Sequence, residues 1–162
     1  MLLFSTHREN RVLFAEKCIC NATDWSKVIF SNEKKFNLDG PDGIYYYWHD
    51  LRNDKEYFSK RQQGRGSVML WGAFSANGKL NLAFIEELQD STKYQKTLEN
   101  NLLLKWSFWV SKEFIFQQDN ATIHTSSSTK TWLARNNINV LDWPACSPDI
   151  NPIENRKIYG FD

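Results

Sequence analysis

The chain lacks a long apolar run, since no stretch approaches the roughly 20 residues that a membrane-spanning helix needs. It also lacks an excess of charge of either sign, because 20 Lys and Arg stand against 19 Asp and Glu. A dedicated DNA-binding domain usually carries a clear basic excess, so any basic surface here must be local. We therefore expect a soluble, intracellular protein with no membrane partner.

Cysteine is scarce as well. Cys18, Cys20 and Cys146 form no even set, and their spacing matches neither a paired zinc framework nor a small secreted disulfide scaffold. Free thiols are therefore expected. By contrast, 41% of the 162 residues are hydrophobic and 15% are aromatic, which is enough to build one domain around a core. No internal repeat or low-complexity tract suggests a second domain.

The spacing of apolar residues predicts a mixed α/β sheet with helices packed against it. Antiparallel strands come first, joined by the strong hairpin turn Asn77-Gly78, and a strand, helix, strand, helix alternation follows. Helices are predicted over residues 6–20, over 91–103 with Ser91 or Thr92 as the cap, and over 126–137. Strands are predicted at residues 28–30, 67–74, 80–87, 114–116 and 138–141, with turns or loops at 40–43 and 45–66.

Two carboxylates stand in dense polar segments. Asp119 lies in QQDNATIH and Glu154 in WPACSPDINPIEN, with 34 residues between them. We expect the preceding strand to end at Asp119, at the sheet edge where ligands of open α/β sheets bind. Pro152 is typical of a first helical turn, which would place Glu154 near a helix N-terminus facing that edge. The alternative is that Asp119 merely caps a turn and Glu154 a helix end.

Clustered carboxylates repel one another unless a cation lies among them, and Mg²⁺ prefers such hard oxygen ligands. Two ions about 3.5 to 4 Å apart can activate a water or a 3′-hydroxyl and stabilise the leaving oxygen of a phosphodiester. The pair Asp119 and Glu154 therefore predicts nuclease or strand-transfer chemistry.

Four segments together carry a family resemblance: DWSKVIFSNEKKFNLDGPDG, GRGSVMLWGAF, FQQDNATIHTS and LDWPACSPDINPIEN. In this order they closely resemble the catalytic domain of Tc/mariner-type transposases, from about Arg8 to Asn155. The resemblance implies an RNase H-like fold, cut-and-paste transposition and an Asp, Asp, Glu triad holding two Mg²⁺ or Mn²⁺ ions. Asp119 falls on the second acid and Glu154 on the third. The resemblance also implies DNA at transposon ends as the partner, a homodimer as the assembly and the nucleus as the location.

The first acid of the triad falls on Asn32, where the family carries Asp. A neutral amide forfeits an interaction on the order of 4 kcal/mol with an adjacent cation at an effective dielectric near 20. Glu33 does not replace it, because adjacent side chains on a strand point to opposite faces. We therefore predict an impaired site. We expect residues 1–24 to form a helical lead-in, from the apolar spacing over residues 6–20. By resemblance, residues 25–162 form the catalytic core, with its C-terminal helices truncated.

Further candidates are basic or aromatic. Lys60, Arg61 and Arg65, beside two glycines, are typical of a phosphate-binding loop, and a solvated loop is the alternative. His124 is a candidate for contact with DNA or a metal-bound water, or else a hydrogen-bonded structural histidine. Three functions stay open: an impaired transposase core, a DNA- or protein-binding module, and a nuclease in which Mn²⁺ compensates for Asn32.

Overall fold

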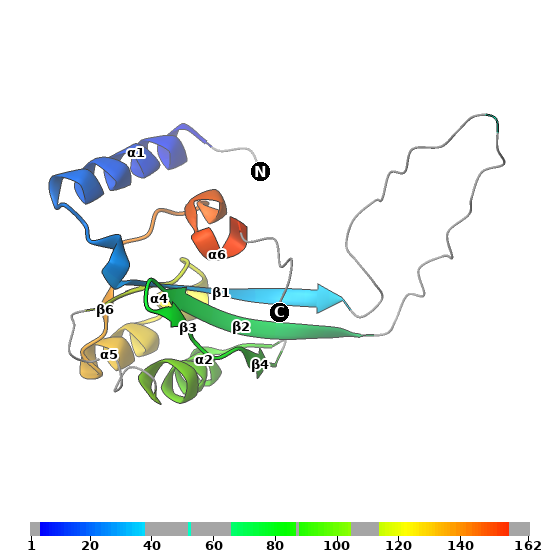
Figure 1. The fold of residues 1–162 in the computed structure, drawn as a ribbon. Coiled ribbons are helices and arrows are strands. Elements are labelled where there is room, and N and C mark those ends of the chain that lie inside the picture. Colours follow the sequence, from blue (N-terminus) through cyan, green and yellow to red (C-terminus); the bar gives the residue numbers. More distant parts are fainter. Residues whose placement is uncertain (1–3, 38–51, 53–65, 87, 105–113, 156–162) are drawn as a thin grey trace.

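The computed structural model describes residues 4–37, 52, 66–86, 88–104 and 114–155 (Figure 1). Within these residues one sheet has the order β3-β2-β1-β5-β6, and β4 also pairs with β2. Strand β1 is antiparallel to β2 and parallel to β5, so the sheet is mixed, as predicted. The strands are β1 (Val28–Asn37), β2 (Ser67–Ser75), β3 (Gly78–Lys79), β4 (Ala83–Ile85), β5 (Ile115–Gln117) and β6 (Asn139–Val140).

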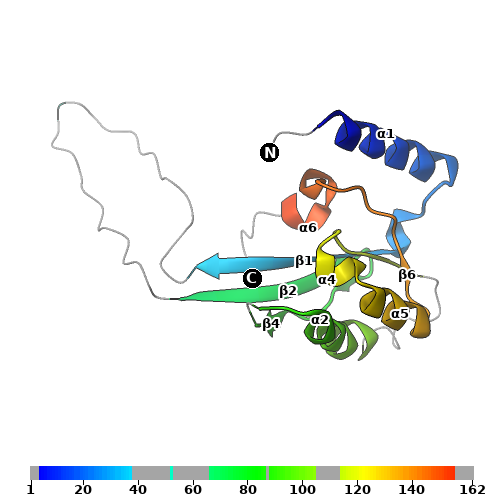
Figure 2. The same cartoon turned by 180° about the vertical axis from the view of Figure 1, so that it is seen from behind.

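Helices cover both faces of this sheet. One side carries α1 and α6, and the other carries α2, α4 and α5, as the two opposite views show (Figures 1 and 2). No helix in the described part of the chain is both long and apolar enough to cross a membrane. The helices are α1 (Ser5–Cys20), α2 (Ser91–Leu98), α4 (Thr122–Thr125), α5 (Ser127–Arg135) and α6 (Pro152–Asn155). Single turns lie at Trp25–Lys27, Glu99–Leu103 and Pro148–Ile150.

Strand β1 separates two hydrophobic clusters. Ile29 belongs to the larger cluster with Trp71, Tyr94 and Phe116, under the helices α2 and α5. Val28 and Phe30 belong to the smaller one with Trp143, against which α1 packs through Phe14. Because side chains alternate along a strand, Asn32 follows Val28 and Phe30 onto the face of α1 and α6. Glu33 follows Ile29 onto the opposite face.

Most predicted elements are found, with corrections at their ends. The strand predicted at residues 80–87 is shorter than expected, because only Ala83–Ile85 pairs with β2, whereas the backbone amide of the buried Leu80 bonds the Ala73 carbonyl. The strand predicted to end at Asp119 ends at Gln117. The predicted turn at 40–43 and almost all of the predicted loop at 45–66 lie outside the described residues.

Helix caps also differ from the prediction. Asp90, rather than Ser91 or Thr92, caps α2, because its Oδ1 accepts the amide of Lys93 at 2.8 Å. Ser126, predicted as the first residue of its helix, instead caps α5 by accepting the amide of Thr129. The short helix α4 before it was not predicted.

Candidate active site

The parallel pairing of β1 and β5 sets two of the predicted site residues beside each other. Phe30 of β1 lies opposite Gln117 of β5. Continuing this register by two residues brings Asn32 alongside Asp119, which follows the end of β5. Asn32 is half-buried and faces Gly72 of β2 on its other side. The register thus predicts that the first and second positions of the expected triad are neighbours at one edge of the sheet.

Glu154 reaches the same region from α6. Pro152 is the first residue of this helix, as predicted, because its fixed φ suits a first turn and its missing N–H is not needed there. The buried Asn151 anchors the helix to β1, since its amide nitrogen donates to the Ser31 carbonyl at 3.2 Å. The side-chain oxygen Oδ1 of Asn151 also accepts the backbone amide of Ile153 at 3.2 Å.

Asp119 and Glu154 line one hollow of about 290 Å³. Burial raises the pKa of Glu154, Lys34 opposes the rise, and the negative charge of Asp119 adds to it. The negative charges of the two carboxylates therefore repel each other across the hollow. Asn32 is not one of the described residues that line it. The remaining lining residues are Asn120, Ala121, Trp143, Pro144, Ala145, Cys146, Ser147, Pro148 and Asn151.

The two oxygens of Asp119 have different surroundings. Oδ1 accepts the amide of Ala121 at 2.9 Å and lies 2.6 Å from Nδ1 of His124. Oδ2 has no hydrogen-bond partner within the described part of the chain. The hydrogen bond from His124 lowers the pKa of Asp119 below its usual value, so the carboxylate stays ionised. One charged oxygen therefore remains available for a ligand.

His124 is buried between two carboxylates. Its Nε2 lies 3.5 Å from Oε1 of Glu33, an ion-pair distance that is long for a hydrogen bond. Burial alone would lower the pKa of His124, but the contacts with Asp119 and Glu33 prevail and raise it to about 9. Its ring also packs on that of Tyr94, with centroids 4.1 Å apart. The imidazolium is the favoured form at neutral pH.

The predicted DNA-binding residues fall into two groups. Lys60, Arg61 and Arg65 lie outside the described residues. His124 is only 2% exposed, which leaves no face of its ring for contact with DNA. We therefore assign His124 to the alternative named above, a hydrogen-bonded histidine inside the structure. Sequence reasoning missed its contact with Glu33, for which the only signal was the position of Glu33 next to Asn32.

The donor set suits one divalent cation better than two. Two carboxylates facing one hollow match the way Mg²⁺ is commonly held, by one or two acids with waters or phosphate completing the shell. Within the described residues, no group of three or more His, Cys, Asp or Glu side chains is placed to hold a metal. The remaining position of the expected triad, that of the first acid, holds the neutral Asn32.

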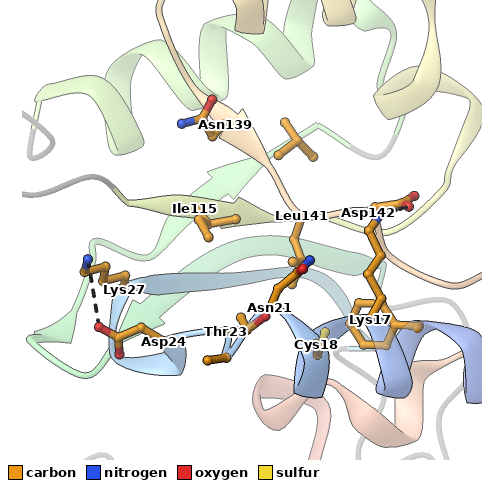
Figure 3. Close-up of a pocket in the computed structure, with 13 residues that line it drawn as sticks. Lys17, Cys18, Asn21, Thr23, Asp24, Lys27, Ile115, Asn139, Leu141 and Asp142 are labelled. Atoms are coloured by element: carbon orange, nitrogen blue, oxygen red, sulfur yellow. Dashed lines mark hydrogen bonds and ion pairs between the residues drawn. The ribbon is translucent and has the colours of Figure 1, made fainter.

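A larger hollow, of about 490 Å³, lies between the C-terminal end of α1 and strand β6 (Figure 3). Its charged side chains are paired with each other. Lys17 bonds Asp142 at 3.0 Å, and Lys27 lies 4.0 Å from Asp24. Because those charges are already compensated, the hollow offers a ligand less than the one between Asp119 and Glu154.

Comparison with solved structures gives the fold class. The chain superposes on the Mos1 transposase paired-end complex with left transposon end at a TM-score of 0.83 and 21% identity, covering 96% of this chain and 47% of that one. The catalytic domain of Mos1 mariner transposase matches at a TM-score of 0.65 and 17% identity, over 96% of this chain and 69% of that one. The fold is thus the RNase H-like fold of a transposase catalytic domain, as predicted.

Sequence comparison gives the family. Residues 27–156 match the DDE superfamily endonuclease family. The Tc3 transposase of Caenorhabditis elegans is 52% identical over 95% of this chain and 46% of its own length. The Tc1 transposase of the same organism is 39% identical over 81% and 49%. The chain therefore belongs to the DDE superfamily endonucleases, as a Tc1/mariner-type transposase domain. It spans about half the length of these relatives.

Proposed function

We propose that this domain acts on DNA phosphodiesters with the help of divalent cations, and that Asn32 impairs it. The observation that carries the proposal is the meeting of Asp119 and Glu154 in one hollow, with the neutral Asn32 alongside Asp119. Two carboxylates lining one hollow support the proposal that Asp119 and Glu154 are two of the three acidic positions. The third provides an amide oxygen without charge.

Each side chain has a distinct part in this proposal. Asp119 presents Oδ2 and Glu154 its carboxylate, and together they would hold a divalent cation against a DNA phosphate. When bound, such ions activate the attacking hydroxyl and stabilise the leaving oxygen. The uncharged amide of Asn32 cannot offset a second cation, so the site favours one ion over two.

The related structures support both ligands of the proposal. The Mos1 catalytic domain was solved with Mg and with Mn, each time together with raltegravir. The Mos1 paired-end complex contains a transposon end. We extend these ligands, Mg²⁺ or Mn²⁺ and transposon-end DNA, to the present chain. A nuclear location and a homodimer are further parts of the proposal.

A second candidate is a DNA-binding or protein-interaction module that no longer cuts. The neutral Asn32 favours it, since loss of one anion weakens metal loading without removing the fold or the surrounding surface. In this case DNA would bind and stay intact. Affinity would fall steeply as salt rises, because binding would rest on contacts with phosphates.

Cleavage and binding assays separate the two candidates. The chain, Asn32→Asp, and the double variant Asn32→Asp, Glu154→Gln are compared on labelled duplex DNA with Mg²⁺ or Mn²⁺. We expect Asn32→Asp to cut faster than the unaltered chain and the double variant to lose that gain. Binding without cutting by every variant, weakened by Arg61→Ala and Arg65→Ala, would favour the binding module instead.

A further inference from the structure

His124 lies between the carboxylates of Asp119 and Glu33 at one edge of the sheet. It is buried in α4, and each of its ring nitrogens faces a carboxylate: Nδ1 that of Asp119 at 2.6 Å, Nε2 that of Glu33 at 3.5 Å. The first carboxylate follows the end of β5, and the second belongs to β1. The imidazole therefore lies between two carboxylates, hydrogen-bonded to Asp119 and at ion-pair distance from Glu33.

The ring has little freedom to turn. It packs at a tilt of 33° against the ring of Tyr94, whose hydroxyl donates to Oε1 of Gln118 at 2.7 Å. The amide nitrogen of Gln118 in turn donates to the backbone carbonyl of His124 at 3.3 Å. A ring flip would also take Nδ1 away from Asp119. The orientation of the imidazole is thus fixed by α2, by β1 and by the segment after β5.

These contacts distinguish the two oxygens of Asp119. Oδ1 is taken by two donors, the imidazole of His124 and the amide of Ala121. Oδ2 has no partner among the described residues, and the side chain of Asp119 is 56% exposed. A carboxylate whose Oδ1 is held by two hydrogen bonds keeps Oδ2 in a fixed orientation for binding a cation. Groups that orient a metal-binding carboxylate commonly contribute 10- to 100-fold to metal affinity or activity.

Strand alternation explains the role of Glu33. Asn32 points to the face of α6, whereas Glu33 points to the face of α4, where its carboxylate meets Nε2 of His124. Without Glu33, that buried nitrogen would face no charge. Consecutive residues of β1 therefore lie on two sides of the sheet, Asn32 on the face of α6 and Glu33 on the face of His124.

We propose that His124, supported by Glu33, is a positioning residue that fixes the carboxylate of Asp119 so that Oδ2 alone meets a divalent cation. The inference rests on the proposed metal-dependent function. It predicts that removing the imidazole weakens metal binding more than does a substitution elsewhere that lowers the free energy of unfolding by the same amount. It also predicts that a side chain which keeps a donor at the place of Nδ1 restores the binding.

The test measures Mn²⁺ binding without DNA, from the EPR signal of free Mn²⁺. All variants carry Asn32→Asp, which adds the acid that the expected triad lacks at position 32. Adding His124→Leu should weaken Mn²⁺ binding about 10- to 100-fold. Adding His124→Asn, which retains a donor near the position of Nδ1, should recover most of the affinity. Thr129→Val is the matched control, because Thr129 is fully buried and bonds the Ile123 carbonyl at 2.7 Å without touching Asp119.

Thermal unfolding of each variant is recorded beside the titration. The control should lose stability and keep its Mn²⁺ affinity. If His124→Leu binds Mn²⁺ as tightly as its parent, or if His124→Asn binds no better than His124→Leu, the positioning role is wrong while the proposed function stands. If Asn32→Asp itself neither binds Mn²⁺ nor cuts DNA, the proposed function fails and this inference with it.

Discussion

Arg11 and Asp149, 138 positions apart, form a two-pronged ion pair with nitrogen to oxygen distances of 2.6 and 2.5 Å. The same guanidinium donates to the Ser147 hydroxyl at 3.3 Å and to the Cys146 carbonyl at 3.4 Å. All three partners lie in the loop that leads to Glu154. Helix α1 is therefore more than a lead-in, because it holds the segment that delivers a site residue.

Removing this tether should loosen the loop before Glu154. We expect Arg11→Ala to lower the urea midpoint of unfolding and to reduce the metal affinity of Asn32→Asp, since Glu154 would be held less firmly. Lys17→Ala is the control, because Lys17 on the same helix pairs with Asp142 where both side chains are exposed. Exposed pairs of this kind contribute little. Equal effects of the two substitutions on metal affinity would contradict the tether.

Placing an acid at position 32 should lower the free energy of unfolding in the absence of a cation. Asn32→Asp adds a negative charge beside Asp119 and near Glu154, and like charges about 4 Å apart in bulk water repel by about 1 kcal/mol. We expect a loss of that order in EDTA, measured as the free energy of unfolding in urea. Added Mn²⁺ should reverse it, because the ion binds only the folded site.

Asn77→Asp provides the matched charge change for that experiment. It adds one carboxylate at an exposed turn between β2 and β3. The backbone N–H of Asn77 donates to the Ser75 hydroxyl there, and the substitution leaves this bond in place. Its stability should not respond to Mn²⁺. A response equal to that of Asn32→Asp would mean that the cation binds elsewhere.

Stability should also depend on pH through His124. Its pKa is raised to about 9 from the ordinary 6.5, so the folded state holds the proton more tightly than the unfolded chain. This contribution is fully present below pH 6.5 and is lost as pH rises through 9. Its size is on the order of 3 kcal/mol. Tyr94 does not titrate in this window, because burial raises its pKa well above 10.

Urea unfolding at several pH values between 6 and 9.5, in EDTA, measures this contribution. The difference in unfolding free energy between the unaltered chain and His124→Asn should shrink as pH rises. A difference that stays constant across the window would show that the imidazole is not held as a cation by Glu33 and Asp119.

The sequence predicted what depends on periodicity and on single strong residues. Helix α1, the strands β1 and β2, and Pro152 at the start of α6 are of this kind. It did not predict α4, because four residues are too few to show a helical repeat. It also did not predict that the strand expected at residues 80–87 is limited to Ala83–Ile85, because the pairing with β2 is a tertiary contact.

The candidate site shows the same division. The convergence of Asp119 and Glu154 was predicted from a strand end and a proline, and the two do line one hollow. The contact of His124 with Glu33 was not predicted, because it joins residues 91 positions apart across two elements. The roles of Asn32, Asp119 and Glu154 in catalysis stay predictions.

Cleavage of labelled duplex DNA in Mg²⁺, by the unaltered chain and by Asn32→Asp side by side, tests the central claim most directly. If a neutral amide is what impairs the site, Asn32→Asp should cut at least about 100-fold faster, equivalent to about 2.7 kcal/mol of barrier. Equal rates for the two proteins, at equal folding and DNA binding, would contradict the account.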